Sequence, residues 1–178
     1  LTAGVIASLA KEMAQKCRTP VCLHLDHGSS IKMAHECFDA GFTSLMYDGS
    51  DLPLEENMAK TKQIVKLASI GGIPVEGEVG RVLIADDIRD SRNLEELTEP
   101  SDAKLFVEKT GVFSVAVAVG NVHGMRAKKA KLDFDRIKAI RNAVDVPLVM
   151  HGSSGISDND IQKAIRAGIT KVNIATEY

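Results

Sequence analysis

The sequence predicts an α/β fold, a TIM (β/α)8 barrel that is present as a fragment with about six of its eight strands. Apolar β-type runs alternate with amphipathic helical stretches along the whole chain. Polar residues follow the carboxyl end of nearly every run, as they do in barrels. A complete barrel needs about 250 residues, whereas this chain has 178. We therefore expect residues 1–178 to form a single barrel domain that is incomplete at the N-terminus and the C-terminus.

The expected strands are short apolar runs rather than alternating ones, which indicates burial on both faces, as in a parallel sheet. Proline enters three of them, at a position where a strand tolerates the missing N–H. Gly41, Gly111 and Gly168 precede the others and are expected to end helices in the left-handed conformation. The six runs cover residues 21–27, 44–50, 74–80, 112–120, 147–152 and 171–176.

Apolar residues at helical spacing predict the helices between these strands. The clearest stripes are Val5-Ile6-Leu9-Met13, Leu54-Met58-Thr61-Val65-Ala68 and Phe134-Ile137-Ile140-Val144. A doubly wound open sheet is the alternative architecture. The barrel is favoured because no run leads into GxGxxG or GxxxxGK[ST], and because polar residues are not confined to one switch point.

Composition excludes several classes of function. With 22 basic and 24 acidic residues the formal net charge is −2, which gives no reason to expect nucleic acid or an anionic membrane as partner. No apolar run is long enough to span a bilayer, and no secretory signal is recognisable. Cys17, Cys22 and Cys37 lack CxxC spacing, so we interpret them as buried, reduced thiols of a cytoplasmic protein. The basic cluster Arg126, Lys128, Lys129, Lys131 is interpreted as a solvated loop.

Three histidines lie at the ends of expected strands, and glycine follows each of them. They are His27, His123 and His151. Catalytic zinc commonly takes three protein ligands and keeps one position open, so these residues predict a Zn²⁺ site above the barrel. His24, inside a strand, and His35, on a helix, lack this placement and are expected to be structural.

Four carboxylates accompany the histidines. Asp26, beside His27, is the candidate for proton transfer, with the orientation of an imidazole as its alternative role. Asp48 is expected to have that supporting role. Glu76 and Glu78 point to the same side of their strand and require cations or donors there; Glu78, nearer the strand end, is the better candidate for contacting metal or substrate.

A glycine- and serine-rich loop, residues 152–155, follows the penultimate strand. Ser157 and Asp160 form a capping-box pair at the start of the next helix, and the last run ends in Asn173-Ile174-Ala175-Thr176. Backbone amides, hydroxyls and a helix N-terminus suit a phosphate group, so we expect this loop to anchor a phosphorylated substrate.

Five segments in order resemble the signatures of the class II, zinc-dependent ketose-bisphosphate aldolase family. They are residues 20–28, 75–81, 120–124, 151–155 and 171–177. The resemblance implies zinc held by His27, His123 and His151, with Glu78 able to approach the metal and Asp26 as the catalytic acid. It also implies that the first two strands and the C-terminal helices of the family barrel lie outside these residues.

The same resemblance implies which groups bind the substrate, dihydroxyacetone phosphate or its parent sugar. These are Gly124, Gly152, Ser154, Asn173 and Thr176. The carbonyls of Val122, Gly124 and Gly152 match a monovalent-cation site, for Na⁺ or K⁺. We also expect a homo-oligomer, either a dimer or a tetramer.

The chain departs from the family in two loops. Residues 81–100 resemble the family's mobile loop, in which two glycines and a glutamate are usual; here Leu83, Ile84 and Asp86 stand in their place. Asp86 is therefore the expected second catalytic carboxylate. After Gly124 the family's phosphate-binding lysine is displaced, with Arg126 or Lys128 as its replacement.

The expected function is reversible cleavage of a ketose 1,6-bisphosphate, fructose or tagatose, to dihydroxyacetone phosphate and glyceraldehyde 3-phosphate. Ala175 favours the tagatose branch of the family. The alternative is a degenerate barrel that binds zinc or a sugar phosphate without catalysis. The altered loop favours that alternative, whereas the intact Asp26 and the three histidines favour the enzyme.

Overall fold

Six parallel strands form one curled sheet in the computed structural model, which describes residues 1–84, 97–124 and 130–175. They follow one another in chain order across the sheet, so the helices between them connect neighbouring parallel strands. Their bounds are β1 His24–Leu25, β2 Ser44–Tyr47, β3 Val75–Val79, β5 Ser114–Val117, β7 Leu148–Met150 and β8 Ile169–Val172.

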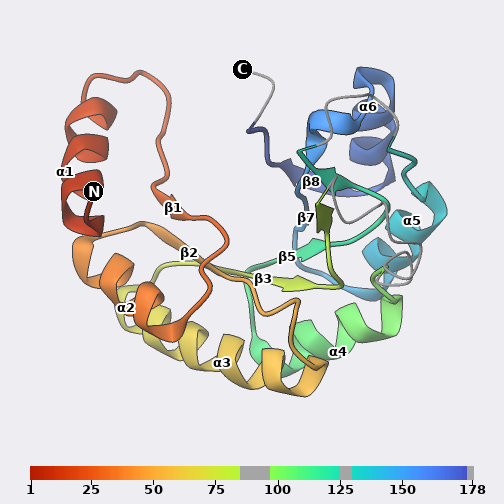
Figure 1. The fold of residues 1–178 in the computed structure, drawn as a ribbon, viewed down its shortest axis with the longest axis horizontal. Helices are drawn as coiled ribbons and strands as arrows, with labels where there is room; N and C mark the ends of the chain where they lie inside the picture. The colour runs from red at the N-terminus through yellow and green to blue at the C-terminus, as the bar shows by residue number, and fades with distance from the viewer. Residues whose placement is uncertain (85–96, 125–129, 176–178) are drawn as a thin grey trace.

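The α-helices of the described residues lie on the outer, convex side of this sheet (Figure 1). A doubly wound sheet would carry helices on both faces, so the arrangement confirms the prediction of a fragment of a TIM-type barrel. The helices are α1 Ala3–Ala14, α2 Ile31–Ala40, α3 Leu54–Gly71, α4 Pro100–Thr110, α5 Phe134–Ala143, α6 Asp158–Ala167 and the 3-10 turn η3 Ser153–Gly155.

Alternate residues of each strand face opposite sides of the sheet. The outward set, exemplified by Leu45, Val115 and Leu148, belongs to the large buried core shared with the helices. The inward set forms a separate apolar group of Met46, Ala116 and Val149. Polar side chains lie directly beside this group, because Glu76 is opposite Met46, Glu78 is opposite Ala116 and Lys171 is opposite Val149 in the strand pairing.

Capping residues fix where the helices begin and end. The side chain of Ser30 accepts from the Met33 amide at the start of α2, and Asp133 accepts from the Arg136 amide at the start of α5. The predicted Ser157 and Asp160 pair is present at α6, where the serine hydroxyl accepts from the Asp160 amide and donates to its carboxylate.

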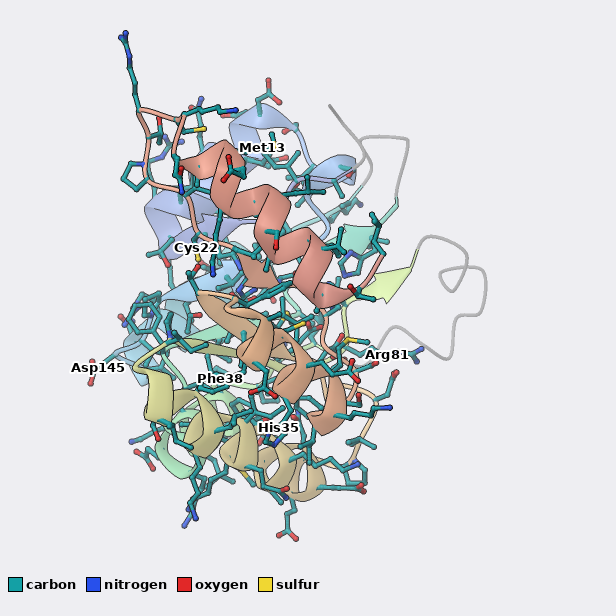
Figure 2. The ribbon with its side chains drawn as sticks, turned by 90° about the vertical axis from the view of Figure 1, so that its left-hand side faces the viewer. Met13, Cys22, His35, Phe38, Arg81 and Asp145 are labelled. Atoms are coloured by element: carbon teal, nitrogen blue, oxygen red, sulfur yellow. The ribbon has the colours of Figure 1, made fainter. Side chains whose placement is uncertain are left out.

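The apolar stripe of α1 is exposed, unlike those of α3 and α5. Its predicted residues Val5, Ile6, Leu9 and Met13 all lie at the surface, and Met13 is seen on the outer side of this helix in Figure 2. Only Ala7 is buried in α1. The helix prediction is therefore correct, and its apolar stripe is exposed in the described chain.

Other differences are confined to edges and short elements. The strand expected over 21–27 pairs only at His24 and Leu25, because β1 is an edge strand with β2 as its sole partner among the described residues. A second, two-stranded parallel sheet joins β4 Leu83–Ile84 to β6 Val122–His123. No pattern in the sequence predicted it.

The cysteine prediction is wrong in part. Cys37 is buried in α2, but Cys17 and Cys22 are exposed because they lie on the connection between α1 and the edge strand β1; Cys22 is marked in Figure 2. Among the helices that the structure describes, none combines the length and apolar character that crossing a bilayer requires. His35 is exposed on α2.

Candidate active site

The three predicted histidines meet at the carboxyl ends of the strands. His27 follows β1, His123 ends β6 and His151 follows β7 directly. Their ring centroids lie 4.5–6.0 Å apart, and one nitrogen from each lies within 4.8 Å of the others. His27 has a φ of +48°, a conformation that costs free energy in a non-glycine residue and is found at functional sites.

Carboxylates fix the orientation of two of these rings. Asp48 lies 2.7 Å from Nδ1 of His27, and Glu76 lies 2.8 Å from Nε2 of His151. The remaining nitrogens, Nε2 of His27 and Nδ1 of His151, then point at one another across 2.8 Å. Histidines that ligate metals typically donate their other ring N–H to a carboxylate in this way.

Glu78 adds a carboxylate that is almost completely buried, with 1% of its surface exposed. Its Oε2 atom has no hydrogen-bond partner among the residues that the structure describes and lies 3.8 Å from Nδ1 of His27. Burial, reinforced by the nearby charge of Asp48, raises the pKa of Glu78 to about 8. A cation beside it would compensate its charge. Three imidazoles with this carboxylate close by are a donor set that fits Zn²⁺.

Burial and neighbouring groups shift the pKa values of three residues of the site. Although burial raises the pKa of Asp48, hydrogen bonds from His27 and Ser50 prevail and lower it to about 2. The bond to Asp48 raises the pKa of His27. Burial, together with the charges of His27 and His151, lowers the pKa of His123 to about 4. His123 is therefore held neutral, the form that binds a metal.

Asp26, the predicted catalytic acid, is exposed at the rim of the site. Its Oδ1 accepts a hydrogen bond from Nδ2 of Asn173 at 3.1 Å, and the same nitrogen lies 3.2 Å from Nε2 of His151. Orienting His27, the alternative role considered for Asp26, falls to Asp48 in the structure.

The predicted phosphate loop is held against the histidines. Gly152 has a φ of +63°, and a Cβ there would lie 2.6 Å from the carbonyl carbon of Val122, so only glycine fits this close approach. The Ser153 hydroxyl donates to the carbonyl of Asn173 at 2.7 Å. Asn121, a residue that the sequence analysis missed, donates from Nδ2 to the carbonyl of His151 at 2.9 Å.

A cavity of about 430 Å³ opens beside the histidines. Arg81, at the end of β3, lies on its wall and pairs with Asp51 at 2.9 Å. Figure 2 shows Arg81 on the opposite side of the molecule from Asp145, which precedes β7 at the amino end of the sheet. The lining residues are His27, Asp48, Ser50, Asp51, Glu78, Arg81, Val82, His123 and Gly124.

The sequence analysis also missed the partner of Glu76. Lys171 of β8 donates to Oε2 of Glu76 at 2.7 Å, the cation that an inward carboxylate required. The predicted residues Asp86 and Thr176, and the candidate phosphate ligands Arg126 and Lys128, lie outside the described residues. Ser154 is buried in η3 next to Gly152.

Comparison with known proteins gives one family over the whole chain. The model of the family described as class-II fructose-bisphosphate aldolase matches residues 1–178. The uncharacterized protein YdjI of Escherichia coli (strain K12) is 46% identical over 165 residues, which are 93% of this chain and 59% of YdjI.

The solved structures that are similar to this chain are also described as aldolases. The crystal structure of the YdjI aldolase from Escherichia coli K12 is similar with a TM-score of 0.82 and 42% identity, over 98% of this chain and 59% of that one. A putative fructose-1,6-biphosphate aldolase from Coccidioides immitis gives 0.84 and 33%, over 96% and 61%. Fructose-bisphosphate aldolase from Campylobacter jejuni gives 0.77 and 27%, over 98% and 57%. The chain thus spans 57–61% of the length of these relatives.

Proposed function

Because the chain belongs to the class-II fructose-bisphosphate aldolase family, we propose that the protein is a zinc-dependent aldolase. It reversibly cleaves a ketose 1,6-bisphosphate, fructose or tagatose, to dihydroxyacetone phosphate and glyceraldehyde 3-phosphate. The observation that carries the proposal is the convergence of His27, His123 and His151, with Nε2 of His27 and Nδ1 of His151 turned toward each other.

In this proposal His27, His123 and His151 hold the zinc ion, and Glu78 can approach it. When bound, zinc supplies the positive charge that stabilises the negative charge developing as the carbon–carbon bond breaks. Asp48 and Glu76 orient two of the rings. Their negative charge also makes the imidazoles better ligands.

Asp26 moves the proton at the substrate's C4 hydroxyl, whose oxygen becomes the aldehyde oxygen after cleavage. Its position supports this role, because it is exposed at the rim of the site and hydrogen-bonded to Asn173. Asn173 in turn lies next to His151. A proton donor at the rim is thereby linked to the metal ligands through one amide side chain.

Gly124, Gly152, Ser154, Asn173 and Thr176 bind the dihydroxyacetone phosphate half of the substrate. The close approach of Gly152 to the Val122 carbonyl supports a monovalent-cation site, Na⁺ or K⁺, built from the carbonyls of Val122, Gly124 and Gly152. Such a cation would offset the charge of a neighbouring phosphate.

Asp86 transfers the second proton, at the carbon of dihydroxyacetone phosphate that is attacked in the condensation direction. The proposal places the protein in the cytoplasm as a homo-oligomer, a dimer or a tetramer. A sugar phosphate is its small-molecule partner, and neither nucleic acid nor membrane is one, in keeping with the near-neutral net charge of −2.

A coupled retro-aldol assay tests the proposal. The intact protein, loaded with zinc, is supplied with fructose 1,6-bisphosphate or tagatose 1,6-bisphosphate, and release of triose phosphate is followed. Cleavage of either sugar supports the enzyme and identifies the branch. Tight binding of dihydroxyacetone phosphate without cleavage of either sugar identifies the degenerate barrel instead.

A further inference from the structure

Lys171 is aimed into the barrel by an irregularity in its strand. In the pairing of β7 with β8, Leu148 lies opposite Ile169, but the next residue, Val149, lies opposite Lys171, so Thr170 is skipped. Without this bulge the alternation of the strand would turn Lys171 outward, because Ile169 already belongs to the outer core. Bulges near active sites redirect side chains in this manner.

The redirected lysine meets Glu76. Its Nζ lies 2.7 Å from Oε2 of Glu76, while the other oxygen of the same carboxylate, Oε1, accepts from Nε2 of His151 at 2.8 Å. Glu76 is 2% exposed and His151 is completely buried. A buried carboxylate is tolerated when a cation and hydrogen-bond donors occupy both of its oxygens. Here Lys171 supplies the cation and His151 supplies the ring donor.

His24 is the second residue that contacts the lysine ammonium group. Its Nδ1 lies 2.8 Å from the Ser44 hydroxyl, which also reaches the Pro74 carbonyl at 3.5 Å. Nζ of Lys171 lies 3.4 Å from Nε2 of His24. Because an ammonium group can only donate, Nε2 is the acceptor in this contact, and Nδ1 of His24 then donates to Ser44. The ammonium group is therefore held between His24 and Glu76.

We propose that Lys171 is a positioning residue for the metal ligand His151, acting through Glu76. Lys171 anchors one carboxylate oxygen, the other oxygen fixes the Nε2–H form of the His151 ring, and Nδ1 is thereby presented to the metal. The inference rests on the proposed zinc site and extends it to a residue that touches neither metal nor substrate.

The test compares zinc affinity across variants of the intact protein, measured by competition with a chromogenic chelator. Lys171→Met is expected to bind zinc about 10- to 100-fold more weakly than the parent, the usual effect of losing a partner behind a ligand. Lys171→Arg, which keeps the cation, should recover most of the loss. Lys163→Met is the matched control, because Lys163 pairs with Asp160 on the surface of α6.

Two further readouts separate positioning from general stability. In the metal-free parent, imidazole ¹⁵N shifts should show His151 as the Nε2–H tautomer, and Lys171→Met should show a mixture of tautomers. The double variant Lys171→Met, Glu76→Gln should bind zinc no more weakly than the weaker-binding of the two single variants. The reason is that the effects of substituting two residues that act through one another do not add.

Parent-like zinc affinity in a folded Lys171→Met protein, or additive effects in the double variant, would overturn the inference. Should Lys171→Met fail to fold, Lys171→Gln compared with Lys171→Arg decides the same point, with weaker zinc binding expected for glutamine. Absence of zinc binding in the parent would overturn the proposed function itself, a separate result.

Discussion

Nε2 of His27 and Nδ1 of His151 face each other across 2.8 Å, although 124 residues separate them in the chain. Each ring is held from behind by a carboxylate, Asp48 for the first and Glu76 for the second. With their N–H groups directed to these carboxylates, both facing nitrogens present lone pairs to the same small space. Two lone pairs at this distance repel unless a shared proton or a metal ion binds both, and with a nitrogen of His123 also within 4.8 Å the three histidines form a donor set that suits a metal ion.

Asp26→Asn should separate proton transfer from metal binding. We expect turnover to fall by roughly 10²–10⁴-fold, the size of a general acid–base contribution, while zinc content and affinity for dihydroxyacetone phosphate stay close to the parent. Asp48→Asn is the matched control, because it alters the carboxylate that orients His27 and should lower zinc affinity. If Asp26→Asn instead loses zinc and keeps its rate per bound metal, Asp26 serves the metal ligands rather than the substrate.

The buried Glu78 predicts how the stability of the metal-free protein depends on pH. Its pKa in the folded protein is about 8, against an ordinary value of 4.5. Between pH 4.5 and pH 8 the Glu78 carboxyl is therefore ionised in the unfolded chain but protonated in the folded protein. The free energy of unfolding falls as pH rises across this range. Glu78→Gln removes this contribution, so its loss of stability over that range should be smaller than that of the parent.

Urea unfolding at pH 5 and pH 8, after exhaustive chelation, measures this difference. Equal losses of stability in the parent and in Glu78→Gln between the two pH values would mean that Glu78 is ionised in the folded protein. That outcome would remove the electrostatic argument for a cation next to this carboxylate.

Gly152→Ala should destabilise the protein by about 1–3 kcal/mol, because its new Cβ would overlap the Val122 backbone. Gly72→Ala is a matched control. Gly72 has a similar φ, +65° against +63°, but a Cβ there meets nothing within 4 Å. The excess loss of stability at Gly152 over Gly72, measured by denaturant unfolding, reports the close approach alone; equal losses would show that the loop moves away without cost.

The sequence predicted the fold because each of the six expected strands of the main sheet carries its own local signal. Apolar runs such as 112–120, bounded by a helix-ending glycine and a polar segment, identify buried parallel strands without any knowledge of their neighbours. The two-residue strands β4 and β6 have no such signal, since a strand this short carries no periodicity. The exposed stripe of α1 was not predictable, because spacing identifies a helix but not what packs against it.

The histidines of the candidate site were predictable from the sequence, but the contacts that support them were not. His27 and His151 follow strands β1 and β7 of the main sheet, so their convergence follows from the barrel, whereas His123 lies on β6 of the small second sheet. The contact between Glu76 and Lys171 depends on a bulge that shifts the register of β8 by one residue. Local sequence does not specify such a shift, and a one-residue shift reverses which side chains point inward.

Titration of the metal-free protein with zinc, with cleavage of the ketose bisphosphate followed at each step, tests the central claim most directly. We expect activity to rise linearly to one zinc ion per subunit and then to stay constant, and His27→Ala, His123→Ala and His151→Ala each to abolish nearly all of it. Full cleavage activity before any zinc is added, or in one of the histidine variants, would contradict a zinc aldolase built on these three residues.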